Sequence, residues 1–328
     1  MNEFRRLARA WLLAVACLLA SAGMVQQATA AEPLASWNDG PARERIVAFV
    51  QAVTDPRGKH YLPPAARIAV FDNDGTLWSE QPIYFQAAFA LDTARAMAAK
   101  DPAIAANPAL AAAAKGDVKA LAEVIALTHA NITTDEFAAR VRDWTRTARH
   151  PTLKRPYTEL TFQPMRELLD YLEAHGFSTW IVSGGGVEFM RTFSQEIYGI
   201  PPERVIGSSI KARYELRDGV PVIVRLPEIE FVDDKEGKPV GIQRQIGRRP
   251  IAAFGNSDGD FQMLEWTTAG AGPRLAMIVH HDDAVREFSY DRGSHIGKLE
   301  RGLDEAATRG WTVISMQDDW KTVYSPAR

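Results

Sequence analysis

The sequence has very little cysteine, no excess of positive charge and no long apolar run. Its 328 residues include a single cysteine, Cys17, in an amino-terminal leader that we expect to be removed. A mature chain without cysteine has no disulfide framework, no thiol nucleophile and no cysteine-ligated metal site. Its stability must therefore come from a hydrophobic core, which a chain of this length can supply.

The charge balance argues against a nucleic-acid partner. Lysine and arginine number 38 against 41 aspartate and glutamate residues, for a formal net charge of −3. Binding to a phosphate backbone requires a basic surface, which this composition does not indicate. Hydrophobic residues make up 46% and charged residues 24%, as in ordinary globular proteins of one large domain or two modest ones.

The first thirty residues have the pattern of a secretory signal peptide. Arg5, Arg6 and Arg9 precede an apolar run at 11–20, and small residues in an A-x-A pattern end at Ala30. The apolar run is too short to span a membrane comfortably. We therefore predict cleavage after Ala30 and a periplasmic or secreted mature protein with no membrane attachment. An uncleaved anchor is the alternative.

Short apolar runs alternate with helical patterns over most of the mature chain. Residues 31–66 read as a lead-in with one helix, and alternation around Asp218-Gly219 predicts a hairpin. Single helices are expected at 186–199 and 296–308. The runs that predict buried strands are 67–71, 178–183, 251–254, 274–281 and 311–316.

Residues 81–150 break this alternation. They are rich in alanine, have helical spacing and lack β-branched runs, so they predict three packed helices, the last with a Thr-Thr-Asp-Glu cap at 133–136. We predict an α/β fold with a doubly wound, mostly parallel sheet built from residues 67–80 and 151–328. An all-helical cap domain at 81–150 is inserted into it.

Polar segments follow three of the predicted strands, and in a parallel sheet reactive groups gather beyond the carboxyl ends of the strands. Lys235 and Lys238 precede the helix that leads into the third of these strands. The three segments are Asp72-Asn73-Asp74-Gly75-Thr76, Ser183-Gly184-Gly185-Gly186 and Gly255-Asn256-Ser257-Asp258-Gly259-Asp260.

These residue types are suited to phosphoryl transfer. Carboxylates gathered at one edge repel one another unless a hard divalent cation lies among them, and oxygen ligands without histidine or cysteine favour Mg²⁺. A serine hydroxyl and glycine-rich N–H groups before a helix make an anion site, and a lysine adds a point charge for phosphate. The combination indicates an aspartyl-phosphate intermediate.

The segments "DNDGT", "IVSGGG", "GK" and "GNSDGDFQML", in that order, resemble the four motifs of the haloacid dehalogenase-like (HAD) superfamily. They are most similar to its phosphoserine phosphatase-type branch. The resemblance covers roughly residues 66–290 and implies a Rossmann-like core, with the helical stretch in the place of the superfamily's first cap domain. It also implies an Mg²⁺-dependent phosphatase that acts on small phosphorylated metabolites.

The resemblance implies a role for each matching residue. Asp72 would be the nucleophile, and Asp74 would protonate the leaving oxygen and then activate water. Lys238 would neutralise developing charge. The implied phosphate-binding groups are Ser183, Gly184, Thr76 and Lys238, and the implied metal ligands are Asp72, the main-chain carbonyl of Asp74, and the loop with Asn256, Asp258 and Asp260. Dehalogenases of the superfamily lack an acid two residues after the nucleophile, so Asp74 favours an oxygen leaving group.

Two departures leave alternatives open. Asn256 stands where the family has an acid, so Asp258 or Asp260 would have to supply the missing charge. Lys238 fits the Gly-Lys pattern before a helix better than Lys235 does. A phosphotransferase or phosphomutase with the same nucleophile is one alternative function, and a non-catalytic phosphate- or metal-binding protein is another.

Two further sets of residues remain ambiguous in sequence. One set lies just after the first segment and either lines the substrate entrance or packs the hinge of the cap: Trp78, Glu80, Tyr84 and Phe85. The segment His280-His281-Asp282-Asp283 is either a metal site or a solvated turn or helix cap. We expect the turn or cap, because adjacent histidines of a strand face opposite ways.

Overall fold

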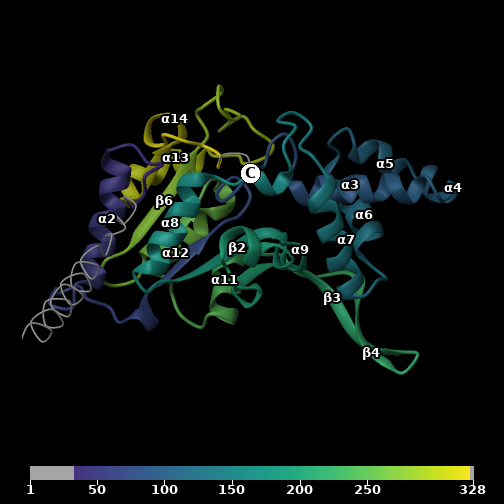
Figure 1. Ribbon diagram of the computed structural model, residues 1–328, viewed down its shortest axis with the longest axis horizontal. Coiled ribbons are helices and arrows are strands. Elements are labelled where there is room, and N and C mark those ends of the chain that lie inside the picture. The colour runs from purple at the N-terminus through teal and green to yellow at the C-terminus, as the bar shows by residue number, and fades with distance from the viewer. Residues whose placement is uncertain (1–32, 326–328) are drawn as a thin grey trace, which may run out of the picture.

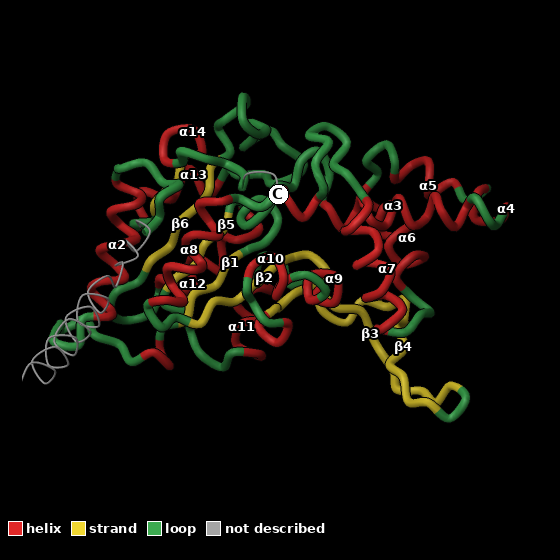
Figure 2. The backbone as a smooth tube through the Cα atoms, viewed as in Figure 1, coloured by secondary structure: helices red, strands yellow, loops and turns green. Residues whose placement is uncertain are grey.

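The fold is built on a sheet of seven strands in the order β4-β3-β2-β1-β5-β6-β7 (Figures 1 and 2). The computed structural model describes residues 33–325, so the expected signal peptide lies outside the described residues. All neighbouring strands are parallel except β3 and β4. The strands are β1 Ile68–Phe71, β2 Ser178–Gly186, β3 Val205–Arg217, β4 Val220–Phe231, β5 Ala252–Gly255, β6 Leu275–His280 and β7 Thr312–Ser315.

Helices cover both faces of this sheet, as a doubly wound fold requires. In β1, Ala69 and Phe71 pack with α2 and α8 on one face, and Ile68 and Val70 pack with α11, α12 and α13 on the other. Both faces are buried, which explains why the central strands are apolar throughout. These helices are α2 Pro41–Thr54, α8 Gln163–Ala174, α11 Gly237–Gln245, α12 Phe261–Thr268 and α13 Arg301–Arg309, and a short α14 spans Met316–Asp319.

The predicted insertion is a group of helices set to one side of the sheet (Figure 1). The second predicted helix is divided, because Gly116 adopts a φ of 90° and the Asp117 side chain caps the helix that follows. The third begins at Thr133 with the expected capping box to Glu136. The helices are α3 Phe85–Ala98, α4 Pro102–Ala105, α5 Pro108–Ala113, α6 Val118–His129 and α7 Thr134–Thr147.

The antiparallel pair β3–β4 extends beyond the sheet towards the insertion (Figure 2). Its turn is the predicted Asp218-Gly219, with φ of 52° and 78°, as a two-residue hairpin requires. Two main-chain bonds join β4 to the insertion: Asn131 N–H donates to the Arg225 carbonyl at 2.8 Å, and Arg225 N–H donates to the Ile132 carbonyl at 2.9 Å. The insertion therefore packs with a hairpin that the prediction had assigned to the core.

Two predicted helices outside the insertion also differ from the structure. The expected helix at 186–199 is two helices, α9 Val187–Arg191 and α10 Ser194–Tyr198, because Phe193 leaves helical geometry and packs its ring against Trp78. The late helix begins at residue 301, not 296, and a carboxylate distant in sequence caps its start, as described below. The other short helices are η1 Pro64–Ala66, η2 Tyr157–Glu159, η3 Pro202–Arg204 and η4 Asp258–Asp260. Within residues 33–325, no helix is long and apolar enough to cross a bilayer.

Candidate active site

A buried ion triad lies at the carboxyl ends of β1, β2 and β5. The Lys238 ammonium donates to Asp72 Oδ1 at 2.6 Å, to Asp260 Oδ1 at 2.5 Å and to the Val182 carbonyl at 3.0 Å. Lys238 is 2% exposed, whereas Lys235 is exposed. The structure thus brings Lys238 to the two carboxylates and leaves Lys235 outside the cluster.

The electrostatics of this triad are set by burial and mutual contact. Burial raises the pKa of Asp72 well above its usual value, and the nearby Asp260 carboxylate raises it further, while Lys238 opposes both. Burial by itself would lower the pKa of Lys238, but Asp260 and Asp72 more than offset this and raise it. Lys238 is therefore a permanent cation, and Asp72 Oδ2 is the carboxylate oxygen left for a reacting group.

Asp74 follows in the turn after β1, with its side chain at the same cavity as Asp72. Trp78 Nε1 donates to Asp74 Oδ1 at 2.7 Å. Burial raises the pKa of Asp74 to about 6, although the bond from Trp78 and the charge of Lys238 oppose the shift. This direction is the one expected for a carboxyl group that donates a proton near neutrality. The turn itself needs glycine: Gly75 has a φ of 74°, and a Cβ there would lie 2.0 Å from Asn256 Nδ2.

The glycine-rich segment lies at a bulge at the end of β2. Ser183 pairs with Gly207 and Gly186 pairs with Ser208, so Gly184 and Gly185 are taken out of the ladder. The Ser183 hydroxyl accepts from Gly185 N–H at 3.2 Å, and both residues line the cavity with Gly184. This arrangement brings a hydroxyl and main-chain N–H groups to Asp72, as an anion cradle would need.

Thr76 is placed differently from its predicted phosphate-binding role. It is fully buried, and its hydroxyl donates to Asn256 Oδ1 at 3.1 Å. Thr76 is not among the described residues that line the cavity. It instead orients the amide of Asn256.

The loop after β5 divides its acidic residues between two places. Asp260 joins the triad, and its Oδ2 accepts from the N–H groups of Asn256 at 2.9 Å and Ser257 at 3.1 Å. Asp258 turns away and caps α13: its carboxylate accepts from the N–H groups of residues 300, 301 and 302. The structure therefore does not bring Asp258 to the cluster, because its oxygens satisfy a helix terminus.

Glu80 is the acid that stands beside Asn256. It is 2% exposed, and its Oε1 accepts from Asn256 Nδ2 at 2.7 Å and from the Tyr290 hydroxyl at 2.8 Å. Burial and the charge of Asp74 raise the pKa of Glu80 well above its usual value. The sequence drew attention to Glu80 without deciding its role, and the structure places it at the cavity. Tyr290 lies in a loop whose sequence pattern did not indicate a role at the site.

His281 corrects the prediction of a solvated turn. Its ring is buried, with Nε2 at 2.8 Å from the Gly75 carbonyl and Nδ1 at 3.1 Å from Glu287 Oε2. The ring also stacks on Tyr290, with centroids 4.4 Å apart. His281 therefore stabilises the turn after β1 through the Gly75 carbonyl, on the side of the turn away from the cavity.

The oxygens at this edge of the sheet suit a hard cation. Within residues 33–325, no three acidic, histidine or cysteine side chains form a metal site by themselves. A cation here would rely on the Asp72 carboxylate and the main-chain carbonyl of Asp74, together with oxygens of substrate and water. The Asn256 amide oxygen, which lies behind the cavity lining and accepts from Thr76, would add its second lone pair. No described residue donates a hydrogen bond to the Asp74 carbonyl, which leaves it available as a ligand.

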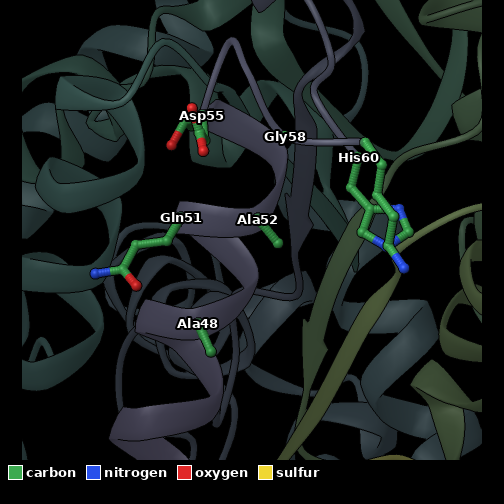
Figure 3. Close-up of a pocket in the computed structure, with 8 residues that line it drawn as sticks. Ala48, Gln51, Ala52, Asp55, Gly58 and His60 are labelled. Carbon is green, nitrogen blue, oxygen red and sulfur yellow. The ribbon is translucent and has the colours of Figure 1, made fainter.

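Two hollows of comparable size lie among residues 33–325. The cavity beside Asp72 has a volume of about 560 Å³ and lies between the strand ends, α6 and the hairpin. The second, of about 670 Å³, lies on α2 and the loop leading to β1. Figure 3 shows that its wall carries Gln51, Asp55 and His60, spread apart rather than convergent.

Comparison with known proteins gives one family match and several structural likenesses. Residues 69–265 match the family model described as haloacid dehalogenase-like hydrolase. The search of curated proteins found no match. A protein of unknown function from Anaerococcus prevotii has 18% identity over 73% of this chain and 86% of its own, with a TM-score of 0.51.

Two phosphatase-like structures align over similar lengths. A phosphoserine phosphohydrolase-like protein from Francisella tularensis has 18% identity over 74% of this chain and 98% of its own, with a TM-score of 0.38. A probable phosphoserine phosphatase from Vibrio cholerae has 15% identity over 79% of this chain and 67% of its own, with a TM-score of 0.39.

Proposed function

Because the chain belongs to the haloacid dehalogenase-like hydrolase family, we propose that it hydrolyses small phosphate monoesters through an aspartyl-phosphate on Asp72. The observation that carries this proposal is the position of Asp72. Lys238 holds one oxygen of its buried carboxylate, and Asp72 shares a cavity with Asp74 and the Ser183–Gly184 cradle. Nucleophile, proton donor and anion site thus converge within one enclosure.

In the first half of the reaction, Asp72 Oδ2 attacks phosphorus and the bond from phosphorus to the ester oxygen breaks. Asp74 gives its proton to the departing oxygen, so an alcohol leaves and an acyl phosphate remains on Asp72. A pKa of about 6 keeps a useful fraction of Asp74 protonated near neutrality.

In the second half, Asp74 accepts a proton from a water molecule as that water attacks phosphorus. The bond between phosphorus and Asp72 Oδ2 breaks, inorganic phosphate leaves and the carboxylate is restored. Lys238 stays charged throughout, so it compensates the negative charge of both Asp72 and the transferring phosphoryl group. The Ser183 hydroxyl and Gly184 N–H bind the non-bridging phosphoryl oxygens.

Asp72, the Asp74 carbonyl and Asn256 would hold a magnesium ion. When bound, the ion neutralises charge on the phosphate and orients it for attack by a carboxylate. The amide of Asn256 brings no charge of its own, but Glu80 contacts it at 2.7 Å. We assign to Glu80 the negative charge that an acid at position 256 would otherwise supply, because a cation bound beside it would favour the ionised form that burial disfavours.

We also propose that the mature protein acts outside the cytoplasm. The support is the sequence of residues 1–30, with its arginines, apolar run and A-x-A site. Amino-terminal sequencing of protein recovered from a periplasmic extract tests this. A mature chain that begins at Ala31 is the expected result, and a chain that retains its leader in the membrane fraction would contradict it.

The direct test of the activity is phosphate release from p-nitrophenyl phosphate by the mature protein, with Mg²⁺ and with chelator. We expect release that depends on the metal and is lost in Asp72→Asn. Trapping the reaction with acid and mass spectrometry should show a phosphate adduct on the peptide that contains Asp72.

Two outcomes separate the alternatives. Transfer of phosphate to an added alcohol in preference to water would identify a phosphotransferase that uses the same nucleophile. Thermal stabilisation by inorganic phosphate or Mg²⁺ without any turnover would identify a binding protein and refute the proposed hydrolysis.

A further inference from the structure

We propose that the substrates are phosphate monoesters of long, apolar, uncharged alcohols, and this inference rests on the proposed hydrolase function. The cavity that begins at Asp72 continues away from the carboxylates, between α6 and the hairpin. Its far wall differs sharply in chemistry from the strand ends. That wall is where the alcohol portion of an ester would lie when its phosphate occupies the Ser183–Gly184 cradle.

The α6 side of this wall is apolar because of its helical spacing. Leu121 and Ile125 are four residues apart, as are Ala122 and Ala126, so both pairs lie on one face of the helix. All four line the cavity. A helix of the insertion thus presents two apolar rows to the enclosure that holds the nucleophile.

The hairpin supplies the opposite side of the wall. Phe231 lines the cavity, as do Ile229 at 67% exposure and Val232 at 53% exposure. Large apolar side chains left this exposed gain free energy when a ligand covers them. Their continuity with the site of Asp72 identifies that ligand as the apolar part of the substrate.

The charges of the cavity argue against a second anionic group on the substrate. Among the described residues that line it, the cationic side chains are Lys238 and Arg225. Lys238 is committed to Asp72 and Asp260. Arg225 pairs with Glu188, donates to the His129 carbonyl at 2.8 Å and lies over the Phe137 ring. No cation is left over for a carboxylate or a second phosphate.

The remaining charged residues in the cavity strengthen this conclusion. The acids Asp74, Glu80 and Asp234 line it as well, and none of the three offers a positive charge to a leaving group that carries a negative one. At about 560 Å³, the cavity also lies in the range of sites for drug-sized ligands. A short polar ester would leave most of the apolar wall uncovered.

The experiment measures binding separately from turnover. Methyl-, butyl- and octylphosphonate, which cannot be hydrolysed, are titrated into the wild-type protein by calorimetry with Mg²⁺ present. We expect affinity to rise roughly fourfold for each of the first few methylenes, as for burial of a CH₂ group. The values of kcat/KM for the matching alkyl phosphates should rise in parallel, and phosphoserine should be a poor substrate.

Matched variants on one strand localise the effect. Ile229→Asn alters an exposed residue of the wall, so folding should be preserved. We expect an about tenfold loss of octylphosphonate affinity with little change for methylphosphonate. Ile223, also exposed on β4 at 42% but outside the cavity lining, is the control, and Ile223→Asn should leave both affinities unchanged.

The outcomes distinguish this inference from the function on which it rests. Hydrolysis of short esters with equal affinity for methyl- and octylphosphonate would overturn the inference and leave the phosphatase intact. Binding that depends on chain length, without hydrolysis of any ester, would support the apolar site and overturn the proposed function. Equal losses in the Ile229→Asn and Ile223→Asn variants would overturn the assignment of the wall.

Discussion

The hollow on α2 is slightly larger than the cavity beside Asp72, at about 670 Å³ against 560 Å³. The α2 hollow carries scattered polar side chains on a surface groove (Figure 3). The cavity beside Asp72 gathers a buried lysine and six carboxyl groups, five on its walls and that of Asp260 directly behind them. Burying charges in this way costs desolvation free energy, which a chain accepts where the charges have a use. The comparison shows that the two hollows differ in the convergence of charge and not in volume, and we base the choice of the candidate site on that convergence.

Replacing Lys238 should have the largest effect on stability and turnover, because the triad of Lys238, Asp72 and Asp260 is what distinguishes this cavity from the α2 hollow. Lys238→Met leaves Asp72 and Asp260 buried without their cation. We expect a loss of about 3–5 kcal/mol in the free energy of unfolding, and turnover below detection. Urea denaturation and phosphate release measure the two effects.

Lys235→Met is the matched control for that change. Lys235 is exposed three residues earlier, so its stability and turnover should match the wild type. A Lys238→Met variant as active as the wild type, or an equal loss in Lys235→Met, would break the assignment of Lys238.

Asp74→Asn should have the next largest effect on turnover. The variant retains the size of the side chain but cannot donate a proton, so turnover of alkyl phosphates should fall by about 10²–10⁴. Turnover of p-nitrophenyl phosphate should fall less, because its leaving group needs no proton. Equal losses for both esters would contradict a role in protonation.

The same variant should change how stability depends on pH. The pKa of Asp74 is about 6 in the fold against 3.8 in the unfolded chain, so between these values only the unfolded state releases the proton. Stability from this group is thus lost as pH rises through that window. In chelator, Asp74→Asn should be no more stable than wild type at pH 3.5, but more stable at pH 8, by up to about 3 kcal/mol. A difference that does not change with pH would contradict the shift.

Metal binding also distinguishes the two hollows, because the α2 hollow has, among its described residues, no cluster of acidic side chains that could bind a cation. Glu80→Gln should weaken Mn²⁺ binding, followed by electron paramagnetic resonance, by about 10–100-fold. Asn256→Asp should strengthen Mn²⁺ binding and destabilise the protein in chelator, since it places a carboxylate against Glu80. Unchanged affinity in Glu80→Gln would remove Glu80 from the cation site.

A smaller effect is expected at Asp258, which shares a loop with the triad but caps α13. Asp258→Ala should cost about 1 kcal/mol of stability and leave Mn²⁺ affinity close to that of the wild type. Chemical denaturation measures the first and metal titration the second. A large loss of metal affinity would contradict this and identify Asp258 as a residue of the cation site.

The smallest effect is expected in the α2 hollow. His60→Ala should change the free energy of unfolding by no more than about 0.5 kcal/mol and leave kcat/KM unchanged. A clear loss of turnover in this variant would show that the α2 hollow contributes to activity and would contradict the distinction between the two hollows.

Local patterns in the sequence predicted much of the fold and part of the site. The apolar runs predicted the parallel strands, and the order of motifs predicted that Asp72, Ser183 and Lys238 would meet. Each of these signals lies within a few residues of a strand end, where geometry follows from the periodicity of the chain. The hairpin turn at Asp218-Gly219 was likewise local.

The parts that were not predictable depend on contacts between distant residues. Asp258 looks like a ligand until α13, more than forty residues later, places three N–H groups against it. His281 looks solvated until the Gly75 carbonyl reaches its ring. Glu80 and Asn256 are 176 positions apart, so neither signals the other in sequence.

The bonds between Arg225 and residues 131–132 have a mechanical consequence. The insertion joins the core by two chain crossings and packs its Phe89 and Trp144 rings near Phe189, and these bonds attach it to the hairpin as well. A movement of the insertion away from the core must either break these two main-chain bonds or move the hairpin as well. The register shifts of β3 near Ser209 and Ile210 lie at the foot of that hairpin, where the ladder is already irregular. The insertion and the hairpin are therefore mechanically coupled, so a displacement of either one is transmitted to the other.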